Sequence, residues 1–188
     1  MRLRLLATAA CCAFLTTASL AQANNQMADK KLDQPAAKAV ASPAATAQIS
    51  LNGKQVKIDY NAPSARGRKV MGGLVPYGEV WRTGANPATT LITATDLKIG
   101  TLDVPAGTYT LFTLPNTDQW LFIVSKKTGE WGIPYPEGND LGRTPMTGKT
   151  LPASQDKMSI SFENTKGNST ELHVKWDTTD QYVTFKAQ

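Results

Sequence analysis

Residues 49–60 read ISLNGKQVKIDY, and this stretch decides the fold class. Apolar and polar side chains alternate on both sides of Asn52-Gly53, which is the period of a strand and not of a helix. Asn-Gly between alternating runs is a strong signal for a β-hairpin closed by a two-residue turn. Such a turn pairs Leu51 with Lys54 and places the apolar residues of both strands on one face. We therefore predict an antiparallel hairpin here.

The same hairpin pattern recurs further along the chain. Residues 97–104 form a second predicted hairpin around Gly100-Thr101. The runs 108–114 and 119–125 are apolar on both faces, which is typical of central strands covered on both sides. Alternation returns in 158–162, 172–176 and 182–185, so these runs are predicted as later strands.

Eight or nine short strands with closely spaced turn signals favour an all-β domain. We expect a single antiparallel β-sandwich, jelly-roll-like in its connections, with a lipocalin-like barrel as the alternative. Residues 132–156 are rich in Pro and Gly and are expected to form a long loop with one edge strand at most. A short helical turn is expected over 72–77, and no amphipathic helix elsewhere in the domain.

The N-terminal residues have the features of an export signal. Arg2 and Arg4 precede a short uncharged apolar run, and an A-x-A cleavage site ends at Ala23, with cleavage after Ala21 as an alternative. We expect a signal peptide at 1–23, a flexible Ala-rich tether at 24–47 and the β-sandwich domain at 48–188. The protein is thus expected to be exported, to the periplasm or to the medium, with no membrane span.

Composition excludes several classes of function. The chain carries a net charge of +5, and loss of the two signal arginines leaves +3, too little to argue for nucleic acid. Both cysteines lie in the signal, so the mature chain has no disulfide. His173 is the one histidine, and we expect it to face solvent on its strand. No cofactor, metal or catalytic residue is predicted, and the oligomeric state is left open.

The segment 66–87 concentrates the chemistry of the domain. It carries four cations, two aromatic rings and five glycines, with a single carboxylate at Glu79. Guanidinium forks suit carboxylate, phosphate or sulfate groups, and aromatic rings can stack on a ligand. The candidate ligand-binding residues are Arg66, Arg68, Tyr77, Glu79, Trp81, Arg82 and Asn86.

Three functional hypotheses follow from this segment. The leading one is a non-enzymatic binding or envelope-associated module for an anionic small molecule or glycan. The second is a glycan-acting hydrolase that uses Glu79 as one of two carboxylates. The third is a structural brace without a ligand, in which Glu79 pairs with Arg82 or Arg68.

The block GRKVMGGLVPYGEVWRTGAN at 67–86, with AGTYTLFTLP at 106–115, also carries a family resemblance. Together with Trp131-Gly132 and the run 160–164, it resembles the bacterial family catalogued as domain of unknown function 2911. The likeness covers most of 48–188. It implies an exported, β-rich bacterial domain, and it brings no activity and no catalytic residue.

Overall fold

The computed structural model describes residues 41–188, and the predicted signal peptide and most of the predicted tether lie outside them. Ten strands and no helix are assigned in the described part of the chain. The strands are β1 (Ala44–Leu51), β2 (Lys54–Asn61), β3 (Thr89–Thr93), β4 (Leu97–Ile99), β5 (Leu102–Val104), β6 (Gly107–Leu114), β7 (Leu121–Ser125), β8 (Asp140–Pro145), β9 (Thr147–Lys166) and β10 (Ser169–Ala187).

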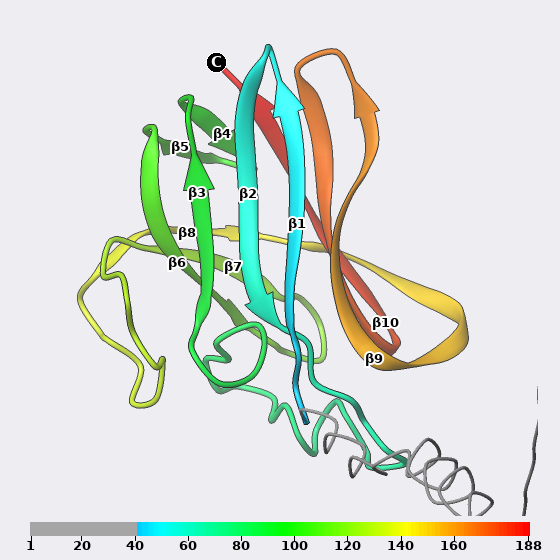
Figure 1. Ribbon diagram of the computed structural model, residues 1–188. Coiled ribbons are helices and arrows are strands. Elements are labelled where there is room, and N and C mark those ends of the chain that lie inside the picture. Colours follow the sequence, from blue (N-terminus) through cyan, green and yellow to red (C-terminus); the bar gives the residue numbers. More distant parts are fainter. Residues whose placement is uncertain (1–40) are drawn as a thin grey trace, which may run out of the picture. The chain divides into compact units, whose positions relative to one another are not determined.

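The strands form two antiparallel sheets (Figure 1). One has six strands in the order β1-β2-β3-β6-β7-β8, and the other has four in the order β5-β4-β10-β9. The predicted all-β sandwich-like fold is confirmed, and the barrel alternative is wrong, because the strands divide into two separate sheets. The long β9–β10 pair dominates the smaller sheet.

Both predicted hairpins have the predicted register. Leu51 pairs with Lys54 across Asn52-Gly53, and both turn residues have positive φ, at 50° and 73°. In the second hairpin Ile99 pairs with Leu102 across Gly100. These short connections fix the register because a slip of one residue would turn every core side chain to the opposite face.

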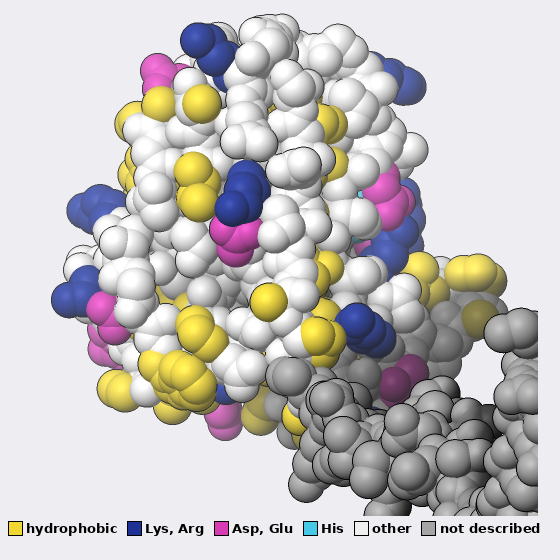
Figure 2. Space-filling view, in the orientation of Figure 1, with side chains coloured by type: hydrophobic (Ala, Val, Ile, Leu, Met, Phe, Trp, Pro, Cys, Tyr) yellow, Lys and Arg dark blue, Asp and Glu magenta, His cyan; other side chains and the backbone are white. Residues whose placement is uncertain are grey.

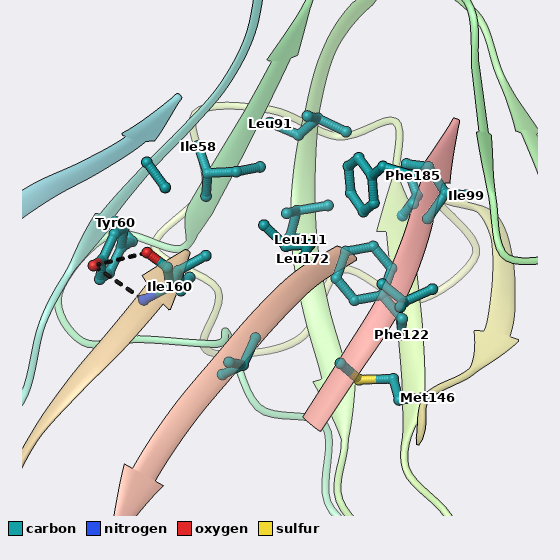
Figure 3. Close-up of a cluster of buried hydrophobic side chains, with 14 of the residues drawn as sticks. Ile58, Tyr60, Leu91, Ile99, Leu111, Phe122, Met146, Ile160, Leu172 and Phe185 are labelled. Atoms are coloured by element: carbon teal, nitrogen blue, oxygen red, sulfur yellow. Dashed lines mark hydrogen bonds between the residues drawn. The ribbon is translucent and has the colours of Figure 1, made fainter. Parts of the chain in front are cut away.

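The main core fills the space between the sheets. Leu91, Leu111 and Phe122 from the six-stranded sheet meet Leu172 and Phe185 from the other (Figure 3). A hydroxyl is also accommodated there: Tyr60 Oη accepts a hydrogen bond from the backbone N–H of Ile160, at 3.1 Å.

A second, smaller cluster lies on the opposite face of the central strands. Phe112 of β6 and Ile123 of β7 are buried there, and Tyr135 packs edge-on against Phe112 with ring centroids 5.0 Å apart. β6 and β7 are therefore covered on both faces, as their apolar runs predicted. The loop between β7 and β8 packs on the face of these strands that points away from the main core.

The C-terminal hairpin is longer than the sequence indicated. β9 begins at Thr147, whereas residues up to 156 were expected to be loop. Its first half is mostly exposed and lacks apolar alternation, so the strand is held by pairing with residues 177–182 of β10. The one expected edge strand is present as β8, which lies at the edge of its sheet.

β10 doubles back on itself. The N–H of Ala187 donates to the carbonyl of Asn168 at 2.9 Å, and the Asn168 side chain returns a bond of 2.7 Å. Residues that far apart would be separated by roughly 60 Å in a straight strand. Register shifts around Asp177, whose φ is 54°, mark the bend. The two predicted runs 172–176 and 182–185 are thus the two arms of one bent element.

Two further expectations need correction. β1 begins at Ala44, inside the range expected to be tether, because Ala44–Gln48 pair with residues 57–61 of β2. The expected helical turn at 72–77 is instead a set of tight turns, in which the N–H of Val75 donates to the carbonyl of Val70 at 2.9 Å.

Candidate functional site

A pocket of about 290 Å³ opens beside the segment 66–87 and is referred to below as the Arg68–Arg82 pocket. Its lining comes from four stretches of chain that are distant in sequence. The lining residues are Ser42, Pro63, Arg68, Leu74, Trp81, Arg82, Gly84, Ala85, Ile133 and Trp176. Two guanidinium groups therefore face one hollow with largely apolar walls.

Trp81 is placed in the pocket by β6, an interior strand of the six-stranded sheet. Its backbone exchanges two hydrogen bonds with Thr113, just beyond the part of β6 that pairs with β3, at 2.7 and 2.9 Å. The indole N–H donates to the carbonyl of Gly84 at 3.1 Å. The ring stacks on Trp176 of β10, with centroids 6.0 Å apart, so the wall joins both sheets.

Arg68 is oriented by the loop that it follows. Its Nε donates to the carbonyl of Ala65 at 2.9 Å, and its Nη2 donates to the carbonyl of Ser64 at 2.8 Å. A guanidinium has five N–H donors, so three remain available. Arg68 forms no ion pair with a carboxylate of residues 41–188.

Arg82 is held by the β7–β8 loop. Its Nη1 donates to the carbonyl of Trp131 at 3.2 Å, and its guanidinium lies over the Trp131 ring, 5.2 Å from the centroid. Burial lowers the pKa of Arg82, but a guanidinium remains charged in proteins. No carboxylate of residues 41–188 lies within ion-pair distance, so the predicted Glu79–Arg82 and Glu79–Arg68 pairs are both absent.

Gly132 allows the loop to approach Arg82 this closely. Its φ is +85°, and a Cβ there would lie 2.9 Å from that of Ala88 and 3.0 Å from that of Arg82. The loop then presents Trp131 and Ile133 outward, the latter 66% exposed. Figure 2 shows hydrophobic side chains gathered at the lower left of the domain. An apolar rim thus borders the two cations.

The structure divides the predicted site. Arg68, Trp81 and Arg82 converge on the pocket, whereas Arg66, Tyr77, Glu79 and Asn86 do not line it. Asn86 supports the wall from behind by donating to the carbonyl of Ser42 at 3.4 Å.

The residues outside the pocket point elsewhere. The Arg66 N–H donates to Asp156 Oδ1 at 2.6 Å, and its side chain reaches the carbonyl of Ala41 at 3.4 Å. Tyr77 lines a different cavity. Glu79 is exposed, does not line the pocket and takes part in no ion pair of the described chain.

Other pocket residues were not identified from the sequence. Trp176 was predicted as a strand residue of the core, and it is indeed buried while also forming part of the pocket wall. Leu74 and Ile133 are exposed apolar residues in turn-rich stretches. An apolar residue in such a stretch is only a weak sequence signal for a binding site. The bend in β10, which brings Trp176 beside Trp81, had no local sequence signal.

His173 contradicts its expected exposure, because only 2% of its side chain is accessible. Its Nδ1 lies 2.7 Å from Asp180 Oδ1, and its Nε2 lies 3.1 Å from Glu171 Oε2. Tyr182 stacks on the imidazole at 4.9 Å. With Glu163 and Lys175, joined at 2.6 Å, these residues form the His173 cluster. Alternation correctly placed His173 on the face away from the core, but the bend in β10 covers it.

Two carboxylates of the His173 cluster have lowered pKa values. Burial acts to raise the pKa of Glu163, but hydrogen bonds from Lys175 and Ser161 and the nearby His173 outweigh it. The hydrogen bond from Asn164 is the main cause of the lowered pKa of Glu171. The cluster therefore favours ionised carboxylates.

No group of three or more His, Cys, Asp and Glu side chains in 41–188 is arranged to hold a metal ion. No helix in that range is long and apolar enough to cross a membrane.

Comparison with known proteins gives one match. No curated protein and no solved structure matches the chain. The model of one protein family matches residues 42–185, which include nearly all of the described domain, the pocket and the His173 cluster. The chain therefore belongs to the family described as Protein of unknown function (DUF2911).

Proposed function

We propose that this domain is a binding module for a small anion, and that the Arg68–Arg82 pocket is its site. The observation that carries the proposal is the presence of two guanidinium groups on one pocket with no carboxylate partner in residues 41–188. Arg82 is half-buried, and a charge that is partly removed from water is unfavourable, so an oxyanion in the pocket would offset that cost.

The walls indicate the rest of the ligand. Trp81, Leu74 and Ile133 offer apolar surface beside the cations, so the favoured ligand carries its carboxylate, phosphate or sulfate on an apolar or ring-shaped body. An acidic glycan belongs to this class, and so does an aryl carboxylate. The pocket lining includes no carboxylate and no histidine that could act as a general acid or base, which supports binding over turnover.

Structural bracing by the same residues is also supported. Arg68 links two backbone carbonyls, and Arg82 packs on Trp131. Bracing uses two donors of Arg68 and one of Arg82, and the remaining donors stay available to a ligand. The two roles predict different results. If the arginines act only as a brace, an arginine variant loses stability but the affinity for every ligand tested is unchanged.

Titration of ¹⁵N-labelled domain with 2-naphthoate and with digalacturonate, followed by NMR, tests the proposal. We expect saturable shifts of the amides around 68, 82 and 131–133 with at least one probe. Arg82→Ala should weaken binding by at least about tenfold, since a hydrogen bond to a charged group contributes about 1.5–3 kcal/mol.

Arg66→Ala is the matched control, because Arg66 belongs to the same segment but does not line the pocket. Its affinity should equal that of the wild type. Equal affinity in Arg66→Ala and Arg82→Ala, or no saturable shift with either probe, would refute the site.

The proposed setting of this activity is outside the cytoplasm. The charged start, apolar run and A-x-A site at the N-terminus support export. N-terminal sequencing of the protein from fractionated cells tests this: we expect a mature chain that starts after Ala21 or Ala23, and an intact Met1 in the cytoplasmic fraction would contradict it.

A further inference from the structure

A second cavity, of about 330 Å³, lies where the turn after β6 faces the β9–β10 hairpin; we call it the polar cavity. The turn contributes Asn116, Thr117 and Asp118, and the hairpin contributes residues 148–150, 178, 179 and 181. Hydroxyl and amide groups predominate in this lining, in contrast to the apolar walls of the Arg68–Arg82 pocket.

Most of these polar side chains have no hydrogen-bond partner among the described residues. Five lining side chains make no hydrogen bond to another residue of 41–188: Asn116, Thr150, Thr178, Thr179 and Gln181. Elsewhere on the same hairpin comparable side chains are engaged, as when Gln155 donates to the carbonyl of Lys157 at 2.6 Å. Hydrogen-bond donors and acceptors from three stretches of chain thus line one cavity, and they remain available to a ligand.

The charge of the polar cavity is balanced. Asp118 and Lys149 are its two charged residues, one of each sign. The Lys149 ammonium is also engaged by the ring of Tyr182, 4.3 Å away. A strongly charged ligand of either sign therefore gains little here, whereas a neutral ligand rich in hydroxyl groups can use the amides and hydroxyls.

An aromatic side chain completes the cavity. Tyr77 lies on its wall with 45% of its surface exposed, so its ring is accessible to a ligand. Trp120 lies beside it, buried and packed edge-on against Trp81 at 6.5 Å. An exposed ring provides an apolar face for the C–H surface of a sugar, while polar groups around it bind the hydroxyls.

Gly148 keeps the hairpin side of the cavity open. A Cβ at this position would lie 2.7 Å from Nε2 of Gln181, so any larger residue would displace that amide. We propose that the polar cavity binds an uncharged saccharide, with Tyr77 stacking on a ring and Asn116 and Gln181 hydrogen-bonding its hydroxyls. This site is distinct from the anion site and does not depend on it.

NMR titration with cellotriose, maltotriose and chitotriose tests this inference on the ¹⁵N-labelled domain. At least one of these should shift the amides of 77, 116–118, 148–150 and 178–181 with saturation at about 10 mM, which requires a Kd near 1 mM. Tyr77→Ala and Gln181→Ala should each weaken that binding by at least about threefold, the effect of one ordinary hydrogen bond or contact.

Two controls separate this site from the first. Gln48→Ala removes an exposed amide on β1, outside the cavity, and Arg82→Ala alters only the anion pocket; both should leave saccharide affinity unchanged. Gly148→Ala, which displaces Gln181, should lower it. Absence of saturation with all three saccharides, shifts centred on Arg82, or full affinity in Tyr77→Ala would overturn the inference.

Discussion

Nδ1 of His173 lies 2.7 Å from Oδ1 of Asp180, although seven residues separate the two along one continuous strand. In a straight strand the same residues would be about 23 Å apart. The contact therefore exists because β10 bends back around Asp177, and it ties the two arms of β10 together. The same bend places Trp176 against Trp81 and so completes the wall of the Arg68–Arg82 pocket.

His173→Ala should lower the free energy of unfolding by about 3 kcal/mol, because it leaves Asp180 buried without its closest partner. Urea unfolding measures this. Lys98→Ala serves as the control, since it removes the partner of Asp103 in a solvent-exposed pair, where a much smaller loss is expected. Similar losses in the two variants would show that the His173 contact does not hold the bend.

The His173 cluster should also make the domain sensitive to acid. Folded-state pKa values of Glu163 and Glu171 lie below the ordinary 4.5. Their ionised forms stabilise the fold above pH 4.5, and this contribution is lost as pH falls through the lowered values. Urea unfolding between pH 7 and pH 3 should show a smaller loss in Glu163→Gln than in the wild type. Glu137→Gln, an exposed residue with no ion pair in 41–188, should match the wild type.

Much of the fold could be predicted from sequence because its determinants are local. Asn52-Gly53 sets a turn and a register by itself, and the double-faced runs of β6 and β7 mark central strands. The bend of β10 depends on contacts between residues distant in sequence, such as Asn168 with Ala187, so no local sequence pattern predicts it. The burial of His173 was missed for that reason.

The lining of the candidate pocket could be predicted only in part, for a related reason. Clustered arginines are visible in the sequence, so Arg68 and Arg82 were identified. Which of the neighbouring side chains share their pocket depends on tight turns at 66–78 and on the approach of the β7–β8 loop. Tyr77 and Arg66 point away because of those turns, and Ile133 enters from a loop 50 residues further on.

Gly132→Ala should destabilise the domain by more than about 1–2 kcal/mol, the cost of placing a side chain in a left-handed conformation. Contacts with Ala88 and Arg82 add to that cost. Gly138→Ala isolates the added part, because Gly138 has a φ of +78° but nothing within 4 Å of its Cβ position. Urea unfolding should give a clearly lower free energy of unfolding for Gly132→Ala than for Gly138→Ala. Equal stability of the two variants would contradict the close approach of the loop to Arg82.

Tyr135 should ionise at a higher pH than an ordinary tyrosine. Burial, together with its hydrogen bond to Asp140, raises the pKa of Tyr135 to about 12. Because the folded value exceeds the ordinary 10.0, the stabilisation is present below pH 10 and is lost as pH rises towards 12. An ultraviolet titration should show a phenol step near pH 12 that is absent in Tyr135→Phe. Persistence of that step in the variant would assign it to another tyrosine.

The Arg68–Arg82 pocket is proposed as an anion site because neither guanidinium group has a carboxylate partner in residues 41–188. The most direct test compares the Kd of 2-naphthoate with that of 2-naphthamide, which has the same rings and no charge, on the wild-type domain by NMR titration. We expect the carboxylate to bind at least about tenfold more tightly, with shifts centred on Arg68 and Arg82. Equal affinity for the two compounds, or no binding of the carboxylate, would contradict the account.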